Sequence, residues 1–122
     1  MRTYALLLLL PAVLLGCDSD GDVVCTNEAV FGILVDPRDA VSNAPLAAHA
    51  TGRVQDGSYT EDFMLPGSND GLLSAAEERP GTYSIIVEHE GYQTWTLDNV
   101  EVKDGICHVN TVRLTAGLEP VE

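Results

Sequence analysis

The clearest pattern in the chain is an alternation of apolar and polar residues in its C-terminal half. Tyr83, Ile85 and Val87 recur at every second position, with Ser84 and Glu88 on the other side. Successive side chains of a β-strand point to opposite faces of the sheet. This spacing therefore predicts a strand that has one face on a hydrophobic core.

Short apolar runs separated by Gly, Pro, Asn and Asp clusters fill the rest of the chain from Cys25 onward, as in a succession of strands and turns. The predicted strands are 29–35, 46–54, 58–65, 83–88, 92–97, 100–102 and 107–114, and 72–78 is either a strand or a helical turn. The residues 36–39 are expected to break the first strand. About seven short strands predict an all-β protein with a single seven-stranded, immunoglobulin-like sandwich.

The phase of these strands predicts which side chains form the core. The expected core residues are Tyr83, Ile85, Val87, Leu97, Val100, Val102, Val112 and Leu114. Val109 is out of phase with the last two. Either a bulge near Asn110 or burial on both faces of the last strand would reconcile them.

A different apolar segment precedes the sandwich. Residues 5–15 are uncharged and follow Arg2. The segment matches the apolar region of a signal peptide and is shorter than the roughly 20 residues that span a bilayer. It ends in Leu14-Leu15-Gly16-Cys17, which resembles the signal of bacterial lipoproteins.

This resemblance implies cleavage before Cys17 and attachment of lipid to that residue. It predicts a signal peptide over 1–16 and a protein held at a membrane of the bacterial cell envelope, inner or outer. The alternative is an ordinary secretory signal that happens to end near a cysteine. The acidic residues 17–24 would form a tether, 25–117 the sandwich and 118–122 a C-terminal tail.

Charge narrows the choice of partners. The chain has 6 basic and 19 acidic side chains, and loss of Arg2 with the signal leaves 5 − 19 = −14. Such an acidic domain is not expected to bind nucleic acid or anionic lipid headgroups.

The cysteines point to an oxidising compartment. With Cys17 lipidated, Cys25 and Cys107 remain, and an even pair in an exported domain predicts a disulfide. Free thiols are the alternative. A bridge requires Cα atoms within roughly 7 Å. The first and last strands would then start at the same end of the sandwich, either as parallel neighbours or facing each other across the core.

Several segments resemble carboxypeptidase regulatory-like domains. The matching segments are Phe31 to Asp36, Ala44-Pro45-Leu46, Pro80-Gly81-Thr82-Tyr83 with the strand that follows, and Gly91-Tyr92. Asp70-Gly71-Leu72-Leu73 departs from the pattern, since leucine replaces an aromatic residue. The resemblance implies a prealbumin-like (transthyretin-like) sandwich that serves as an accessory module beside enzymes or transporters.

Candidate chemistry is sparse. The histidines His49, His89 and His108 begin no His-x-x-Glu motif, and no Gly-x-Ser-x-Gly sequence occurs. We therefore expect that the protein is not an enzyme and that it needs no metal or cofactor.

Tyr92 and Trp95, together with Tyr59, could form an aromatic platform for a sugar or a peptide. Alternatively, Trp95 belongs to the core, because it is in phase with Leu97. The sequence predicts a non-catalytic, lipid-anchored envelope domain with a structural or protein-interaction role. The other hypothesis is a carbohydrate- or peptide-binding module of an envelope uptake system.

Overall fold

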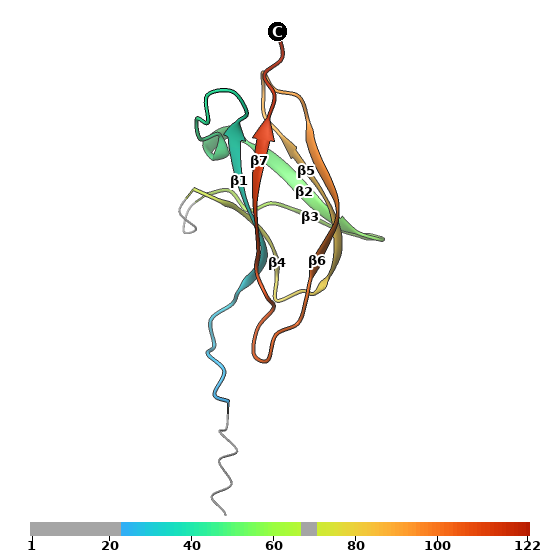
Figure 1. Cartoon of the computed structure of the whole chain (residues 1–122). Coiled ribbons are helices and arrows are strands. Elements are labelled where there is room, and N and C mark those ends of the chain that lie inside the picture. Colours follow the sequence, from blue (N-terminus) through green and yellow to red (C-terminus); the bar gives the residue numbers. More distant parts are fainter. Residues whose placement is uncertain (1–22, 67–70) are drawn as a thin grey trace, which may run out of the picture.

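The computed structural model describes residues 23–66 and 71–122. Over these residues, seven strands form two sheets that pack face to face (Figure 1). The strands are β1 (Phe31–Asp39), β2 (Thr51–Asp56), β3 (Tyr59–Asp62), β4 (Leu73–Glu77), β5 (Gly81–Glu88), β6 (Trp95–Val102) and β7 (Val112–Leu118). The predicted all-β, seven-stranded sandwich is confirmed. The predicted signal peptide and Cys17 lie outside the described residues.

The smaller sheet has the strand order β4-β1-β7, and the larger one has the order β3-β2-β5-β6. In the smaller sheet, β1 pairs with β4 antiparallel and with β7 parallel, with Ile33 opposite Val112 and Asp39 opposite Leu118. The first and last strands thus start at the same end as parallel neighbours. This is one of the two arrangements that a bridge between Cys25 and Cys107 predicts.

The core lies between the sheets and follows the predicted alternation in β5. Tyr83, Ile85 and Val87 are fully buried, and Val100 and Val102 are also buried. From the smaller sheet, Ile33 and Val35 meet them, since both belong to the same buried cluster. The predicted core positions Tyr83, Ile85, Val87, Val100 and Val102 are confirmed.

Leu97 is predicted to be buried, but the residue is 37% exposed. It pairs with Ile85 and so lies on the inner face, but β6 is the edge strand of its sheet. Between Leu97 and Val100 the register shifts, and Asn99 adopts a φ of 60°. The extra residue of this bulge keeps both apolar side chains on one face although they are three residues apart.

The last strand starts later than predicted, so its buried residues differ. Ala116 and Leu118 are fully buried, whereas Val112 and Leu114 are only partly buried. Val109 is buried outside the strand, where it forms a bridge with Asp104. Val109 is out of phase with Val112 and Leu114 because it belongs to the loop before β7. Neither a bulge near Asn110 nor burial on both faces of the last strand is the reason. Leu118 also lies one residue beyond the expected end of the sandwich.

Two other predicted boundaries are wrong. The segment 36–39 continues β1, and Pro37 is buried opposite Ala116. Because β4 pairs with β1 only as far as Val35, β1 has one regular neighbour here, and proline is tolerated at such an edge. The segment predicted as a strand over 46–54 begins with a 3-10 turn, η1 (Ala47–His49), before β2 starts.

Candidate functional site

The predicted disulfide is confirmed at the end of the sandwich where the chain enters. The Sγ atoms of Cys25 and Cys107 are 2.03 Å apart, and their Cα atoms are 5.2 Å apart. The bridge joins the segment before β1 to the loop between β6 and β7, which projects from the same end (Figure 1). We call this region the tether end.

Glu78, in the β4–β5 connection, holds the tether end together through hydrogen bonds to two other segments. Its Oε1 accepts from the Val30 N–H at 2.9 Å and pairs with Nδ1 of His108. Its Oε2 accepts from the Val109 N–H at 3.3 Å. His108 in turn contacts the Thr26 hydroxyl through Nε2 at 3.0 Å. One carboxylate therefore joins the segment before β1, the β4–β5 connection and the β6–β7 loop.

These contacts determine the protonation of Glu78. Desolvation acts to raise its pKa, but the hydrogen bonds from His108, Val30 and Val109 outweigh it, and the pKa lies below its ordinary value. A carboxylate with a lowered pKa in the folded state stabilises the fold above its ordinary pKa, and this stabilisation is lost as the pH falls through the lowered value.

We expect Glu78→Gln to lower the melting temperature at neutral pH, because the charged acceptor is removed while the side chain keeps its shape. The difference from the native chain should persist down to about pH 4.5, the ordinary value of the carboxyl, and shrink at lower pH. Thermal unfolding followed by circular dichroism between pH 3 and 7 measures it. Glu77→Gln is the matched control: Glu77 is a likewise exposed glutamate in the preceding position, none of the side-chain hydrogen bonds of the described residues involves it, and the change should leave the melting curve nearly unchanged. An equal loss in both variants would contradict the role of Glu78.

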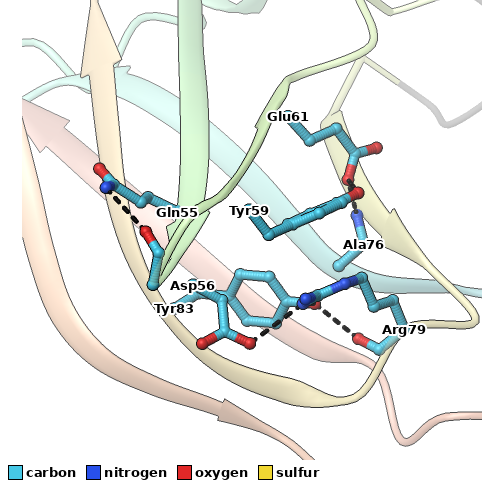
Figure 2. A network of polar contacts seen from close by, with 8 residues as sticks. Gln55, Asp56, Tyr59, Glu61, Ala76, Arg79 and Tyr83 are labelled. Atoms are coloured by element: carbon cyan, nitrogen blue, oxygen red, sulfur yellow. Dashed lines mark hydrogen bonds and ion pairs between the residues drawn. The ribbon is translucent and has the colours of Figure 1, made fainter.

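A second polar cluster links the free edges of the two sheets, β3 and β4 (Figure 2). The Arg79 guanidinium lies over the ring of Tyr59, 3.7 Å from its centroid. Its Nη1 donates to Asp56 at 3.1 Å and to the hydroxyl of Tyr83 at 2.8 Å, and that hydroxyl donates to the Arg79 carbonyl oxygen. Gly81 makes room for the ion pair, since a Cβ there would collide with the Asp56 carboxylate.

The same cluster stabilises an unusual backbone conformation. Ala76 is fully buried and has a φ of 57°, in the left-handed region that non-glycine residues seldom adopt. Its N–H donates to Glu61 at 2.9 Å, and Glu61 also accepts from the Tyr59 hydroxyl. The hydrogen bonds of Glu61 join β3 to β4, and those of Arg79 join Asp56 to Tyr83, so the cluster ties the two sheets together at this edge.

The predicted binding residues Tyr92 and Trp95 lie towards the other end of the sandwich, which we call the far end. There the end of β1, η1 and the C-terminus lie together (Figure 1). The Tyr92 hydroxyl donates to Asp39 at 2.7 Å, which raises the pKa of Tyr92. Backbone N–H groups of Ser42 and Val41, together with Tyr92, hold the pKa of Asp39 below its ordinary value.

The three aromatic rings do not form one platform. Trp95 pairs with the buried Val87 and packs, half-buried, against the core. Tyr59 stands on β3, at the opposite edge of the sheet from β6. Instead, two histidines accompany Tyr92: its ring lies 5.0 Å from that of His89, which lies 6.4 Å from that of His49. The sequence analysis missed this row because its members come from three segments and no spacing connects them.

A groove of about 390 Å³ crosses the outer face of the larger sheet. Arg53 pairs with Asp62 on one side and with Ile86 on the other. Its neighbour Val54 is buried, so Arg53 and its two partners point to the opposite, outer face, where Ile86 lies among polar side chains. The groove is lined by Thr51, Gly52, Arg53, Asp62, Phe63, Leu65, Ile86 and Glu88. Its volume is within the range of small-molecule sites, although it is open to solvent.

Comparisons with known proteins assign no family to the chain: no protein-family model matches it, and no curated protein is significantly similar. Among residues 23–66 and 71–122, no helix is long and apolar enough to cross a membrane. Over the same residues, no three His, Cys, Asp or Glu side chains are grouped so that they could hold a metal ion.

Proposed function

We propose that the protein is a non-catalytic, lipid-anchored β-sandwich of the bacterial cell envelope, with a structural or protein-interaction role. The observation that carries this proposal is the Cys25–Cys107 disulfide, eight residues after the lipoprotein-like motif that ends at Cys17. Disulfides persist in exported proteins and are rare in the cytosol. The motif and the bridge are independent features, and both favour export.

The proposed relationship to carboxypeptidase regulatory-like domains is supported by where the matching segments lie. Pro80-Gly81-Thr82-Tyr83 enters β5, the strand that carries three fully buried side chains. Gly91 has a φ of 85° and turns the chain towards β6. Both motifs therefore have structural roles, in keeping with an accessory module.

A non-catalytic role is supported by the use that the sandwich makes of its polar groups. In the described part of the chain, the carboxylates of Asp56, Glu61 and Glu78 accept hydrogen bonds from neighbouring segments. Arg79 donates a hydrogen bond to the Tyr83 hydroxyl, which donates in turn to the Arg79 carbonyl oxygen. Groups committed in this way stabilise the fold rather than act on a substrate.

Replacing Cys17 with serine tests the anchor. We expect the native chain to fractionate with membranes. The Cys17→Ser variant should lose this association, because residue 17 then has no thiol to which the lipid can be attached. Mass spectrometry of the native chain should find an N-terminal peptide that begins at a modified Cys17. Cys25→Ser/Cys107→Ser is the control, since it removes cysteines but should stay in the membrane fraction. An unmodified N-terminus at another residue would refute the proposal.

The groove on the larger sheet favours a second candidate function, the binding of a carbohydrate or a peptide. Arg53, Asp62 and Glu88 offer both donors and acceptors around the partly buried Ile86. If the groove binds such a ligand, Arg53→Ala should abolish binding to a glycan or peptide array, whereas Arg113→Ala, on the other sheet, should leave it intact. An array with no binder at all would leave the first proposal as the only candidate.

A further inference from the structure

Three large aliphatic side chains are strongly exposed at the tether end. Val23 is 62% exposed, Val24 is 88% exposed and Ile106 is 87% exposed. A single exposed aliphatic residue is ordinary on a protein surface, but a group of them marks a contact surface.

The disulfide brings these residues to one place. Val24 precedes Cys25 and Ile106 precedes Cys107, and the two cysteine Cα atoms are 5.2 Å apart. Because adjacent Cα atoms are about 3.8 Å apart, the Cα atoms of Val24 and Ile106 lie within about 13 Å of each other. The exposed aliphatic side chains thus lie on the two segments that the disulfide joins, the end of the tether and the tip of the β6–β7 loop.

The β6–β7 loop is built to hold Ile106 in this exposed position. The Gly105 N–H donates to the carbonyl oxygen of His108 at 2.8 Å, and the Asn110 N–H donates to that of Lys103 at 2.8 Å. Gly105 is required here, since a Cβ would collide with the His108 carbonyl oxygen. The buried Val109 anchors the base of the loop through its hydrogen bond to Glu78. The exposure of Ile106 is therefore fixed by the fold.

We propose that Val23, Val24 and Ile106 rest on the lipid surface and orient the sandwich with its tether end on the bilayer. This inference rests on the proposed lipid on Cys17. Val23 is the sixth residue after Cys17, so even a fully extended chain keeps Val23 within about 22 Å of the lipidated residue. The exposed aliphatic side chains and the point of attachment are thus at the same end.

The charge of the protein selects the kind of lipid surface. The tether carries Asp18, Asp20 and Asp22, Asp104 flanks the loop tip, and Lys103 is the chain's single lysine. An anionic surface would repel these carboxylates. The apolar tip therefore fits a surface of zwitterionic headgroups, where aliphatic side chains enter the boundary between headgroups and acyl chains. Contact of this kind should depend little on salt.

This orientation would present the far end and its aromatic row to the surroundings. β1 spans nine residues between the two ends, a length of about 30 Å in an extended strand. Val41, which is 78% exposed, lies in the turn after β1 at the far end. It offers an aliphatic position of similar exposure that should not meet the bilayer.

Tryptophan fluorescence in vesicles tests the orientation. The full lipidated chain is reconstituted in phosphatidylcholine vesicles whose acyl chains carry bromine, with Ile106→Trp or Val41→Trp in a Trp95→Phe background. We expect the emission at position 106 to shift to the blue and to be quenched several-fold more than that at position 41. If Trp95→Phe impairs folding, the same two variants with Trp95 retained give the answer as a difference in quenching.

The outcomes separate the inference from the proposed function. Vesicles that float with the protein while neither position is quenched would overturn the orientation, leave the anchor in place and assign the aliphatic surface to a protein partner. Equal quenching at both positions would also overturn it. If the protein does not float with vesicles at all, the lipid anchor itself fails, and the orientation fails with it.

Discussion

Replacing both Cys25 and Cys107 with serine is expected to lower the free energy of unfolding by about 4.5 kcal/mol. The two cysteines are 82 residues apart, so the bridge closes the chain from before β1 to after β6 into one loop. In the loop-entropy model, a closed loop of this length restricts the unfolded chain by that amount. Because small domains are stable by only about 5–15 kcal/mol, the variant should be marginal.

The folded structure itself should change little in this variant. Glu78 still joins Val30 and Val109, and the Thr111 hydroxyl still donates to the Phe31 carbonyl oxygen at 2.8 Å. The β-sheet circular dichroism at low temperature should therefore match that of the native chain, while the denaturant midpoint falls. Reduction of the native chain should reproduce the lower midpoint, and the double variant should not respond to reductant. A change below about 1 kcal/mol would show that the bridge constrains the unfolded chain far less than its loop length implies.

The disulfide also shows why the topology could be predicted from the sequence. A bridge limits two Cα atoms to a short separation, so the positions of Cys25 and Cys107 determine that two strands start together. The structure has this arrangement as the parallel pair β1 and β7. Likewise, alternation alone identified β5, because this strand has one neighbour on each side and a core on one face.

Edges and loops could not be predicted in the same way. The half-exposure of Leu97 depends on β6 being an edge strand and on a bulge at Asn99, and neither feature has a local sequence signal. Pro37 belongs to β1 because β4 ends before it, which is a property of a partner strand distant in sequence. The start of β7 was displaced because Val109 is buried by a loop contact rather than by a strand.

The polar contacts of the candidate sites could not be predicted from the sequence, because their partners are distant along the chain. Arg79 meets Asp56 across 23 positions, and Glu78 meets His108 across 30. No spacing in the sequence connects His49 with His89, although the fold brings their ring centroids to 6.4 Å. Such groupings follow from how strands are ordered in the sheets. The two cysteines were predicted to meet because disulfide chemistry pairs cysteines with each other, whereas an arginine or a histidine has many possible partners.

The Ile85→Ala variant is expected to lose about 2–4 kcal/mol of unfolding free energy. Ile85 is fully buried at the centre of β5, and it faces a cluster that includes Ile33, Val35 and Leu73. Truncation removes apolar contacts and leaves a cavity, because the strands on both sides of β5 hold the backbone in place. Chemical denaturation should show a lower midpoint with an unchanged slope.

Ile86 is the matched control for this measurement. It is the same residue type in the next position of the same strand, but it points to the outer face and is only partly buried. Ile86→Ala should therefore cost at most about 1 kcal/mol, since less apolar surface returns to water. The strand propensity lost with isoleucine is the same in both variants, so the difference between them isolates core packing. Equal losses would contradict the difference in packing between the two faces of β5 on which the prediction for Ile85 rests.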